Sequence, residues 1–210
     1  MGCCNAIDSY FADKHATRDL ESYRRKGPAP TTKLLINAVL NAGITNARLL
    51  DIGAGIGVLQ HELLQHGVKS VEHVDASKSY LRVAQSECEQ RGNTHRVTFI
   101  SGDFTDPNLD VGEAEVVLLD RVLCCYPNYL DLVKRSTERC LQLYAISYPR
   151  NHVLARIAFF FDNLERRLQG KSFRAFVHRI EDVEALVASS GLTLNSVHNT
   201  LLWRVAVFRR

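Results

Sequence analysis

Three glycines and two aspartates, close together in the chain, have the types and spacing of a nucleotide-binding site. Asp51 is followed by glycines at every second position, Gly53, Gly55 and Gly57, and Asp75 ends the next apolar run. Glycine reaches positive φ without strain and, lacking a side chain, lets a ligand lie against the backbone where a helix begins. An acidic side chain at the end of the following strand can accept hydrogen bonds from both hydroxyls of a ribose. The segment therefore predicts a site for a ligand that contains a nucleoside.

The register of the glycines distinguishes between two such ligands. The dinucleotide fingerprint G-x-G-x-x-G would need its last glycine at Val58, but the third glycine comes one residue early. The pattern Asp51-x-Gly53-x-Gly55-x-Gly57 resembles the first motif of class I S-adenosylmethionine-dependent methyltransferases. The charge agrees with this resemblance, because an acidic residue at position 51 would repel a diphosphate and suits a ligand with an ammonium and a sulfonium. An NAD-dependent oxidoreductase is the less favoured alternative.

The resemblance implies S-adenosyl-L-methionine as the cofactor and adds contacts at two further strand ends. Gly102-Asp103-Phe104 resembles the third motif of the family, which implies that Asp103 holds the adenine amino group and that Phe104 lies near the ring. From the residues alone, an aspartate after a strand is equally a common turn residue. Asp120 could contact either the cofactor or the acceptor. The expected cofactor-binding set is Asp51, Gly53, Gly55, Asp75, Ala76, Asp103, Phe104 and Asp120.

The acceptor site is harder to predict from the sequence. Methyl transfer from a sulfonium is an in-line displacement, so the protein must mainly position the donor and the acceptor in a dry pocket, and few catalytic residues are obligatory. Polar side chains at or just after strand ends are the candidates. If a base is used, we expect His152 or His178, although a lone histidine is more often structural. The catalytic candidates are therefore His152, His178 and Tyr126, and the candidates for substrate binding are Tyr10, Tyr23, Arg24, Arg121 and Tyr148.

A closer resemblance covers most of the chain. The leader Tyr23-Arg24-Arg25-Lys26-Gly27 and the segment Asp120-Arg121-Val122 with Cys125-Tyr126-Pro127 resemble small bacterial methyltransferases related to magnesium-protoporphyrin O-methyltransferase. In an enzyme that methylates a propionate no base is needed, and Arg121 or Arg150 could orient the carboxylate. The chain lacks the [N/D]-P-P-[Y/F] motif of enzymes that methylate DNA bases or glutamine amides, which argues against a nucleic-acid acceptor.

The elements that must position these residues alternate between apolar runs and helical spacing. The expected strands are 48–52, 70–75, 97–101, 114–120 and 141–148, followed by an antiparallel pair at 192–200 and 201–208. The expected helices are 5–26, 33–42, 58–64, 77–91, 130–140 and 181–190, with Thr31 or Thr32 as the cap of the second. This order predicts an α/β, Rossmann-like fold with a seven-stranded, mostly parallel sheet, an antiparallel C-terminal hairpin and helices on both faces.

The chain divides into an N-terminal helical cap, residues 1–30, and a methyltransferase domain, residues 31–210, with a helical insertion or lid at 150–178. Within that insertion, Phe159, Phe160 and Phe161 point around much of a helix, so we expect one turn to be almost wholly covered. The segment could be a substrate lid, a homodimer surface, a membrane-facing patch or plain core packing.

Composition limits the remaining possibilities. The chain has 210 residues, 46% of them hydrophobic, and a net charge of +3, which suits an ordinary globular protein with a full core. The six cysteines lack C-x-x-C spacing, so we expect reduced thiols, no metal site and a cytoplasmic protein, with the role of Cys3-Cys4 left open. The expected partner is a small-molecule acceptor, with no nucleic acid and no integral membrane contact. A protein that binds S-adenosylmethionine without catalysis is the main alternative to an enzyme.

Overall fold

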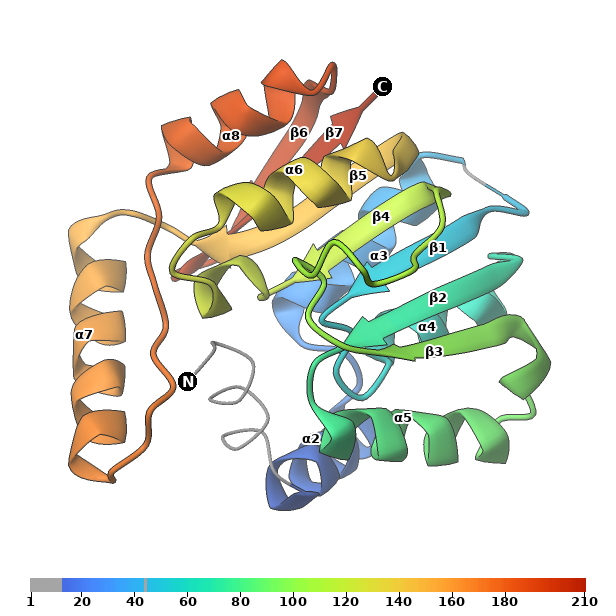
Figure 1. Ribbon diagram of the computed structural model, residues 1–210, viewed down its shortest axis with the longest axis horizontal. Coiled ribbons are helices and arrows are strands. Elements are labelled where there is room, and N and C mark those ends of the chain that lie inside the picture. Colours follow the sequence, from blue (N-terminus) through green and yellow to red (C-terminus); the bar gives the residue numbers. More distant parts are fainter. Residues whose placement is uncertain (1–12, 44) are drawn as a thin grey trace.

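The computed structural model describes residues 13–43 and 45–210 (Figure 1). The strands are β1 (Arg48–Ile52), β2 (Ser70–Asp75), β3 (Val97–Ser101), β4 (Ala114–Asp120), β5 (Cys140–Pro149), β6 (Thr193–Asn199) and β7 (Trp203–Arg209). The α-helices are α2 (Asp13–Lys26), α3 (Pro30–Asn41), α4 (Val58–Gln65), α5 (Lys78–Gln90), α6 (Leu130–Glu138), α7 (Val153–Leu168) and α8 (Ile180–Ser189). Two short 3-10 helices, η1 (Thr94–Arg96) and η2 (Leu123–Cys125), precede β3 and follow β4.

The seven strands form one sheet in the order β3-β2-β1-β4-β5-β7-β6. The first five are parallel, and β7 runs antiparallel to both β5 and β6. This arrangement confirms the predicted fold class. The strand order reverses direction between β1 and β4, and in open α/β sheets ligands bind in the crevice beyond the carboxyl ends of the strands at such a point.

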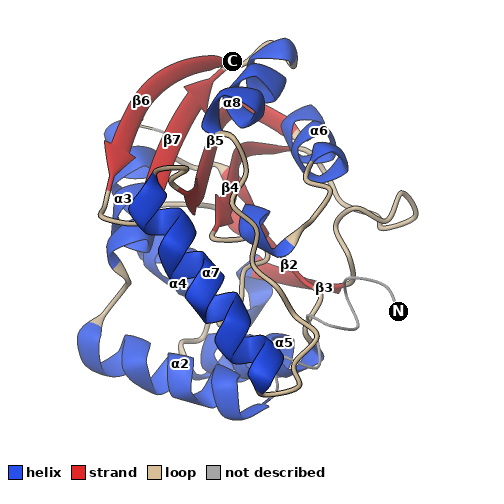
Figure 2. Ribbon diagram, turned by 90° about the vertical axis from the view of Figure 1, so that its left-hand side faces the viewer, coloured by secondary structure: helices blue, strands red, loops and turns tan. Residues whose placement is uncertain are grey.

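Helices cover both faces of the sheet (Figures 1 and 2). Leu49 of β1 faces α3 and α4, whereas Leu50 of the same strand faces α6 and α8, and the same alternation repeats along β4. Because both faces are covered, the central strands read as nearly continuous apolar runs. Helix α5 packs against β2 and β3, and α2 packs against α5.

The start of α3 differs from the expected cap. The helix begins at Pro30, with Ala29 at the N-cap and no side-chain hydrogen bond there. Proline suits the first helical position because its φ is already helical and it has no N–H to satisfy. Thr31 and Thr32 are instead buried in the first turn. The prediction that either threonine caps this helix is therefore wrong, and the hydroxyl of Thr32 is directed to another element described below.

The three consecutive phenylalanines of α7 also differ from expectation. Phe159 faces inward and packs edge-to-face on Trp203, with ring centroids 5.7 Å apart. Phe160 and Phe161 point outward and are 62% and 61% exposed. The expectation that this turn is almost wholly covered is therefore wrong. The helix stands at one side of the molecule, joined to α8 by an extended segment that runs back alongside it (Figure 1).

Within the described ranges, no helix combines the length and the apolar character required to cross a bilayer.

Candidate active site

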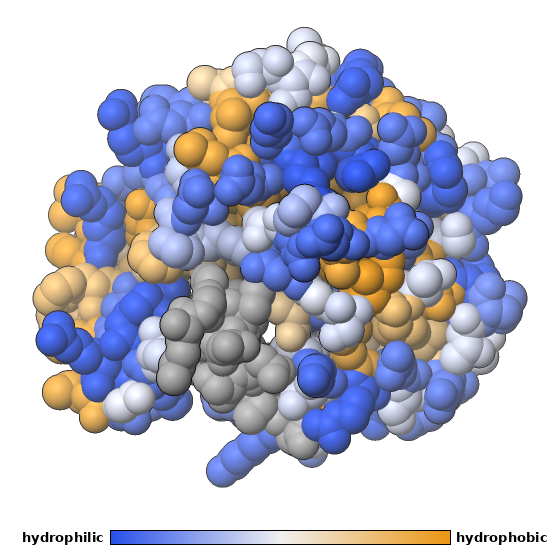
Figure 3. Space-filling model, viewed as in Figure 1, coloured by the Kyte–Doolittle hydropathy of each residue, from blue (hydrophilic) through white to orange (hydrophobic). Residues whose placement is uncertain are grey.

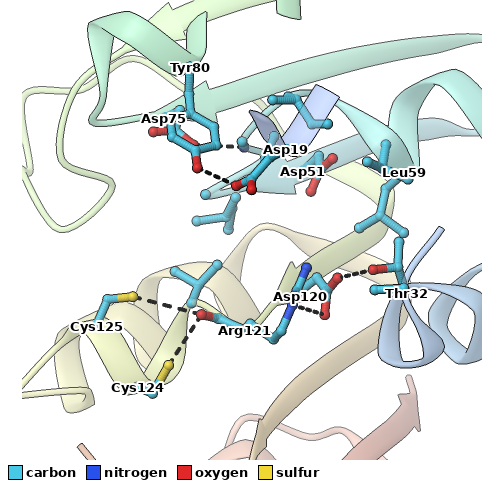
Figure 4. A pocket seen from close by; sticks show the side chains of 18 of the residues that line it. Asp19, Thr32, Asp51, Leu59, Asp75, Tyr80, Asp120, Arg121, Cys124 and Cys125 are labelled. Carbon is cyan, nitrogen blue, oxygen red and sulfur yellow. Dashed lines mark hydrogen bonds and ion pairs between the residues drawn. The ribbon is translucent and has the colours of Figure 1, made fainter. Parts of the chain in front are cut away.

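A cavity of about 930 Å³ opens at the carboxyl ends of the strands (Figure 4). Its walls come from α2 and α3, from the loop between β1 and α4, from the ends of β2 and β4, and from η2, α7 and the start of β7. Pockets for small ligands measure roughly 300–1,000 Å³, so this cavity lies near the upper end of that range. It has room for more than one small molecule.

The loop between β1 and α4 lies at the floor of the cavity and is shaped by its glycines. Gly53 donates its N–H to the carbonyl of Val74 at 2.8 Å and has a φ of 63°. A Cβ atom at Gly53 would lie 2.5 Å from a methyl group of Val122, and one at Gly55 would lie 3.4 Å from the ring of Tyr80. Positive φ and close contact together therefore require glycine at position 53.

Asp75 joins this loop to the end of β2. One carboxylate oxygen accepts the N–H of Gly55 at 2.8 Å, and the other accepts the N–H of Ser77 at 2.8 Å. Ser77 in turn caps α5. Asp75 and Ala76 both line the cavity. The carboxylate therefore fixes the glycine loop while lying at the cavity wall.

Asp51 is a buried carboxyl that has no hydrogen-bond partner among the described residues. It is 1% exposed and lines the cavity, and neither of its oxygens is hydrogen-bonded within the described part of the chain. Burial, together with the nearby carboxyls of Asp120 and Asp75, raises the pKa of Asp51 well above its ordinary value. Buried polar groups in native proteins almost always have partners. A cationic ligand group that donates hydrogen bonds here would supply the missing partner, and the ammonium of S-adenosylmethionine has that chemistry.

The Asp103 carboxylate supports a turn. It accepts hydrogen bonds from the N–H and hydroxyl of Thr105, at 3.0 and 2.8 Å, and from the hydroxyl of Tyr126 at 2.9 Å. The neighbouring Phe104 is buried and lines the cavity, as Gly102 and Tyr126 do, whereas Asp103 does not. The turn role considered for Asp103 is thus present, and its contact with adenine stays a prediction.

Asp120 and Arg121 end β4 on the other side of the cavity. The Asp120 carboxylate accepts hydrogen bonds from the hydroxyls of Thr32 and Ser147, the latter at 2.6 Å. The same Ser147 hydroxyl accepts the N–H of Arg121 at 2.7 Å. Arg121 has a φ of 61°, uncommon for a residue with a side chain, and its guanidinium lies 3.6 Å from Asp120 while its side chain is 46% exposed. The guanidinium is therefore both paired and available at the cavity.

Neither histidine proposed as a base lines the cavity. His152 caps α7, since its Nδ1 accepts the N–H of Ala155 at 3.1 Å and its Nε2 lies 2.9 Å from the carbonyl of Leu201. His178 directs Nε2 to the carbonyls of Leu123 and Tyr126, and burial lowers its pKa. Both rings fasten segments of the chain together. The structure therefore does not support the prediction that one of them is a catalytic base. Of the three catalytic candidates, only Tyr126 lines the cavity.

Some of the residues predicted to bind the substrate line the cavity and others do not. Tyr23 and Arg121 line the cavity, with the Tyr23 hydroxyl donating to Glu62 at 2.7 Å. Arg24 instead pairs with the buried Glu87 of α5 and also contacts Gln90. Tyr148 is 1% exposed and donates to Glu184 at 2.8 Å beneath α8. Arg24 and Tyr148 are therefore structural residues, and Tyr10 lies outside the described residues.

Part of the cavity wall consists of residues that were not among the predicted site residues. The inner face of α7 contributes Phe159 and an ion pair between Asp162 and Arg166 at 2.7 Å, and β7 contributes Trp203. The three α7 residues are spaced three to four positions apart and therefore lie on one face of the helix. The sequence alone could not show that this face borders the cavity.

Within residues 13–43 and 45–210, no group of three or more metal-ligating side chains is gathered. Cys88, Cys124, Cys125 and Cys140 are free thiols.

The sheet order, the glycine loop and the acidic residues at the ends of β1 and β2 together make the fold of the class I S-adenosylmethionine-dependent methyltransferases. A family described as "Methyltransferase domain" matches residues 49–142, which include the glycine loop and the ends of β2 and β4. S-adenosylmethionine is the cofactor of that class, and solved structures with this fold contain it or its demethylated product.

Solved structures share the whole fold. Magnesium protoporphyrin IX methyltransferase from Synechocystis PCC 6803, with bound S-adenosylhomocysteine, superimposes with a TM-score of 0.75. That comparison covers 100% of both chains at 16% sequence identity. The same enzyme with bound S-adenosylmethionine gives a TM-score of 0.73 over 100% of this chain and 98% of that one, again at 16% identity.

A curated relative identified by sequence has a different type of acceptor in its name. Ribosomal protein arginine N-methyltransferase rmt3 of Schizosaccharomyces pombe is 30% identical over 150 residues, which are 68% of this chain and 26% of that protein. The chain thus spans between a quarter and a third of the length of the curated relatives it matches.

Proposed function

We propose that the chain transfers the methyl group of S-adenosylmethionine to a small-molecule acceptor held beside Arg121. The observation that carries the proposal is that one cavity has two chemically different ends. One end has the glycine loop, Asp51 and Asp75, which suit the cofactor. The other end has an aromatic and basic wall from α7, β7 and Arg121, which suits an acceptor.

At the cofactor end, we assign Asp51 to the ammonium group and Asp75 to the ribose hydroxyls. The Asp51 oxygens accept no hydrogen bond from the part of the chain that the structure describes, and this supports the first assignment, because a cationic donor would satisfy a buried carboxylate. The position of Asp75 at the end of the second strand supports the other assignment. Gly53 and Gly55 let the ligand approach the backbone closely.

When bound, the cofactor supplies an activated methyl group on a sulfonium. The protein must then position the acceptor and exclude water. The hydroxyl of Tyr126 donates to Asp103, and both candidate histidines lie outside the cavity. We therefore propose an acceptor that is already anionic when it binds, such as a carboxylate, oriented by the guanidinium of Arg121.

The arginine side chain named for the curated relatives fits this cavity less well. Recognition of a guanidinium calls for carboxylates that present free oxygens to it. On the acceptor side, Asp162 pairs with Arg166 and Asp120 accepts hydrogen bonds from Thr32 and Ser147. Asp19 accepts the hydroxyl of Tyr80. Because these three carboxylates already have partners, the cavity favours an anionic small molecule over an arginine side chain as the acceptor.

The first experiment is calorimetric titration with S-adenosylmethionine, S-adenosylhomocysteine and NADH. We expect binding of the first two without NADH. Formation of S-adenosylhomocysteine is then measured with pools of aromatic carboxylic acids, porphyrin carboxylates included, and with arginine-containing peptides. Turnover with the acids supports the proposal, whereas turnover with the peptides alone overturns the acceptor assignment. Cofactor binding without turnover on any pool favours a protein that binds the cofactor without catalysis.

We also propose that the protein works in a reducing compartment such as the cytoplasm. The four free thiols in the described part of the chain support this proposal. Their retention as thiols can be checked by counting free thiols in protein isolated without reductant. A disulfide among these four would contradict the proposal.

A further inference from the structure

One face of α7 is apolar and exposed along its whole length. Val153, Ile157, Phe160, Phe161, Leu164 and Leu168 are between 38% and 81% exposed. Their spacing of three to four residues places them on one side of the helix, which we call the outer face of α7. Figure 3 shows hydrophobic residues along that edge of the molecule, at the position of α7. Contiguous apolar surface of this kind marks an interaction site more often than single exposed residues do.

The opposite side of the same helix is already used. Ala155 is fully buried, and Ala158, Phe159, Asp162 and Arg166 line the cavity. The outer face is therefore not a poorly packed part of the core, since α7 already has a buried side. It is a second, separate surface of the helix.

The charge around α7 indicates what covers this surface. The segment from residue 150 to residue 179 contains seven Arg or Lys residues and two Asp or Glu residues, a net charge of +5. The whole chain has a net charge of only +3, so the remainder is net negative. Arg156 and Arg167 are exposed on one flank of the outer face. A helix with an apolar face and a basic flank is the form that binds in the plane of an anionic membrane surface.

Pairing with a second copy of the chain fits these charges less well. When two identical helices pack antiparallel across a two-fold axis, the same flank of each helix lies beside that of its partner. Arg156 and Arg167 would then lie beside Arg156 and Arg167 of the second copy, and these like charges would repel each other. An anionic surface instead complements both residues.

We propose that the outer face of α7 binds the surface of a bilayer rich in anionic lipids, with Phe160 and Phe161 inserted and Arg156 and Arg167 against the headgroups. The helix would lie parallel to the surface, so this is peripheral attachment. The proposal does not depend on the acceptor assigned above, because its test measures vesicle binding alone.

The test is sedimentation of the full chain with phosphatidylcholine vesicles, prepared with and without phosphatidylserine. We expect binding that requires phosphatidylserine. Phe160→Ser with Phe161→Ser should lower the partition coefficient at least about 100-fold, because each buried phenylalanine contributes about tenfold or more. Arg156→Gln with Arg167→Gln should lower it about 25-fold, at about fivefold for each charge.

A matched control removes apolar residues of similar exposure elsewhere. Leu130 and Leu194 are 51% and 47% exposed on α6 and β6, and replacing both by serine should leave vesicle binding unchanged. Titration with S-adenosylhomocysteine verifies that each variant is folded. Absence of binding to anionic vesicles, or an equal loss in the control, would overturn the proposal. So would a wild-type dimer that ignores vesicles and dissociates when Phe160 and Phe161 are replaced, because the outer face would then join two copies.

Discussion

The carboxylate of Asp75 accepts the backbone N–H of Gly55 at 2.8 Å, across the loop that forms the cavity floor. Replacing Asp75 by alanine therefore removes a proposed ribose contact and also leaves a backbone donor of the loop without its acceptor. Hydrogen bonds to charged groups contribute about 1.5–3 kcal/mol each, so we expect affinity for S-adenosylhomocysteine to fall about 10–100-fold. Asp75→Asn keeps one acceptor oxygen and should have an intermediate effect. Calorimetry measures both affinities, and an unchanged affinity in Asp75→Ala would remove Asp75 from the site.

Asp51 should stabilise the bound cofactor and destabilise the free protein. Its pKa is raised in the folded state, so the folded protein holds a proton that the unfolded chain releases at lower pH. The free energy of unfolding from this group therefore decreases as pH rises above the ordinary carboxyl pKa of about 4 and through the folded pKa. Asp51→Asn should lack that decrease and be more stable than the wild type at neutral pH, yet bind S-adenosylmethionine more weakly. Urea unfolding from pH 4 to pH 8, with and without cofactor, tests both effects, and a variant less stable at neutral pH would contradict them.

His61 should make the protein sensitive to acid. Its side chain is fully buried, and this burial lowers its pKa to about 4. Below pH 6.5 the unfolded chain takes up a proton that the folded chain does not, so stability falls as pH decreases toward 4. The resulting loss of unfolding free energy is about 3 kcal/mol, because each unit of pKa shift corresponds to 1.36 kcal/mol.

Replacing His61 by leucine should flatten that part of the curve of unfolding free energy against pH. His95 is exposed in η1, and His95→Gln serves as the matched control that keeps the wild-type slope. Equal slopes in the wild type and His61→Leu would show that this histidine is not responsible.

Gly53 should be the least replaceable glycine of the loop. Alanine there would adopt a φ of 63° and place its Cβ 2.5 Å from Val122. The left-handed backbone costs about 1–2 kcal/mol and the overlap about 1–3 kcal/mol more. Gly170, with a φ of 70° and nothing within 4 Å of an added Cβ, isolates the backbone part when replaced by alanine. Denaturant unfolding should show that Val122→Ala partly rescues Gly53→Ala, and a double-mutant cycle without coupling would disprove the contact.

Arg121 should act on the acceptor and not on the cofactor. Asparagine tolerates the positive φ of this position, so Arg121→Asn removes the guanidinium with little change in backbone strain. Loss of one charge-assisted contact should lower kcat/KM for an anionic acceptor about 10–100-fold. Affinity for S-adenosylhomocysteine, measured by calorimetry, should remain that of the wild type. Equal losses in both measurements would move Arg121 to the cofactor side.

The fold was predictable to a large extent because its signals are local. Apolar runs and glycine turns identify strands and loops, and β1 through β5 lie within one or two residues of the predicted ranges. Asp51, Gly53, Gly55 and Asp75 line the cavity for the same reason, since they are adjacent in sequence to strand ends, and their contacts with the cofactor stay predictions. Helix caps were less predictable, because Pro30 begins α3 where a threonine was expected.

Most of the proposed acceptor wall could not be predicted, because it depends on how distant segments meet. His152 and His178 follow strand ends or loops just as catalytic residues do, and only their contacts show that they cap a helix and fasten a segment. Arg24 illustrates the same limit, since its partner Glu87 is 63 residues away. No local pattern specifies which of two faces of α7 borders the cavity.

The position of β7 between β5 and β6 has a consequence for the order of assembly. β6 pairs only with β7 in the described sheet, so it cannot join until β7, the later of the two in the chain, has docked on β5. Ribosomal synthesis releases Trp203 after every other described residue of the cavity wall. The proposed cofactor end can thus be synthesised completely before the last residue of the proposed acceptor end leaves the ribosome.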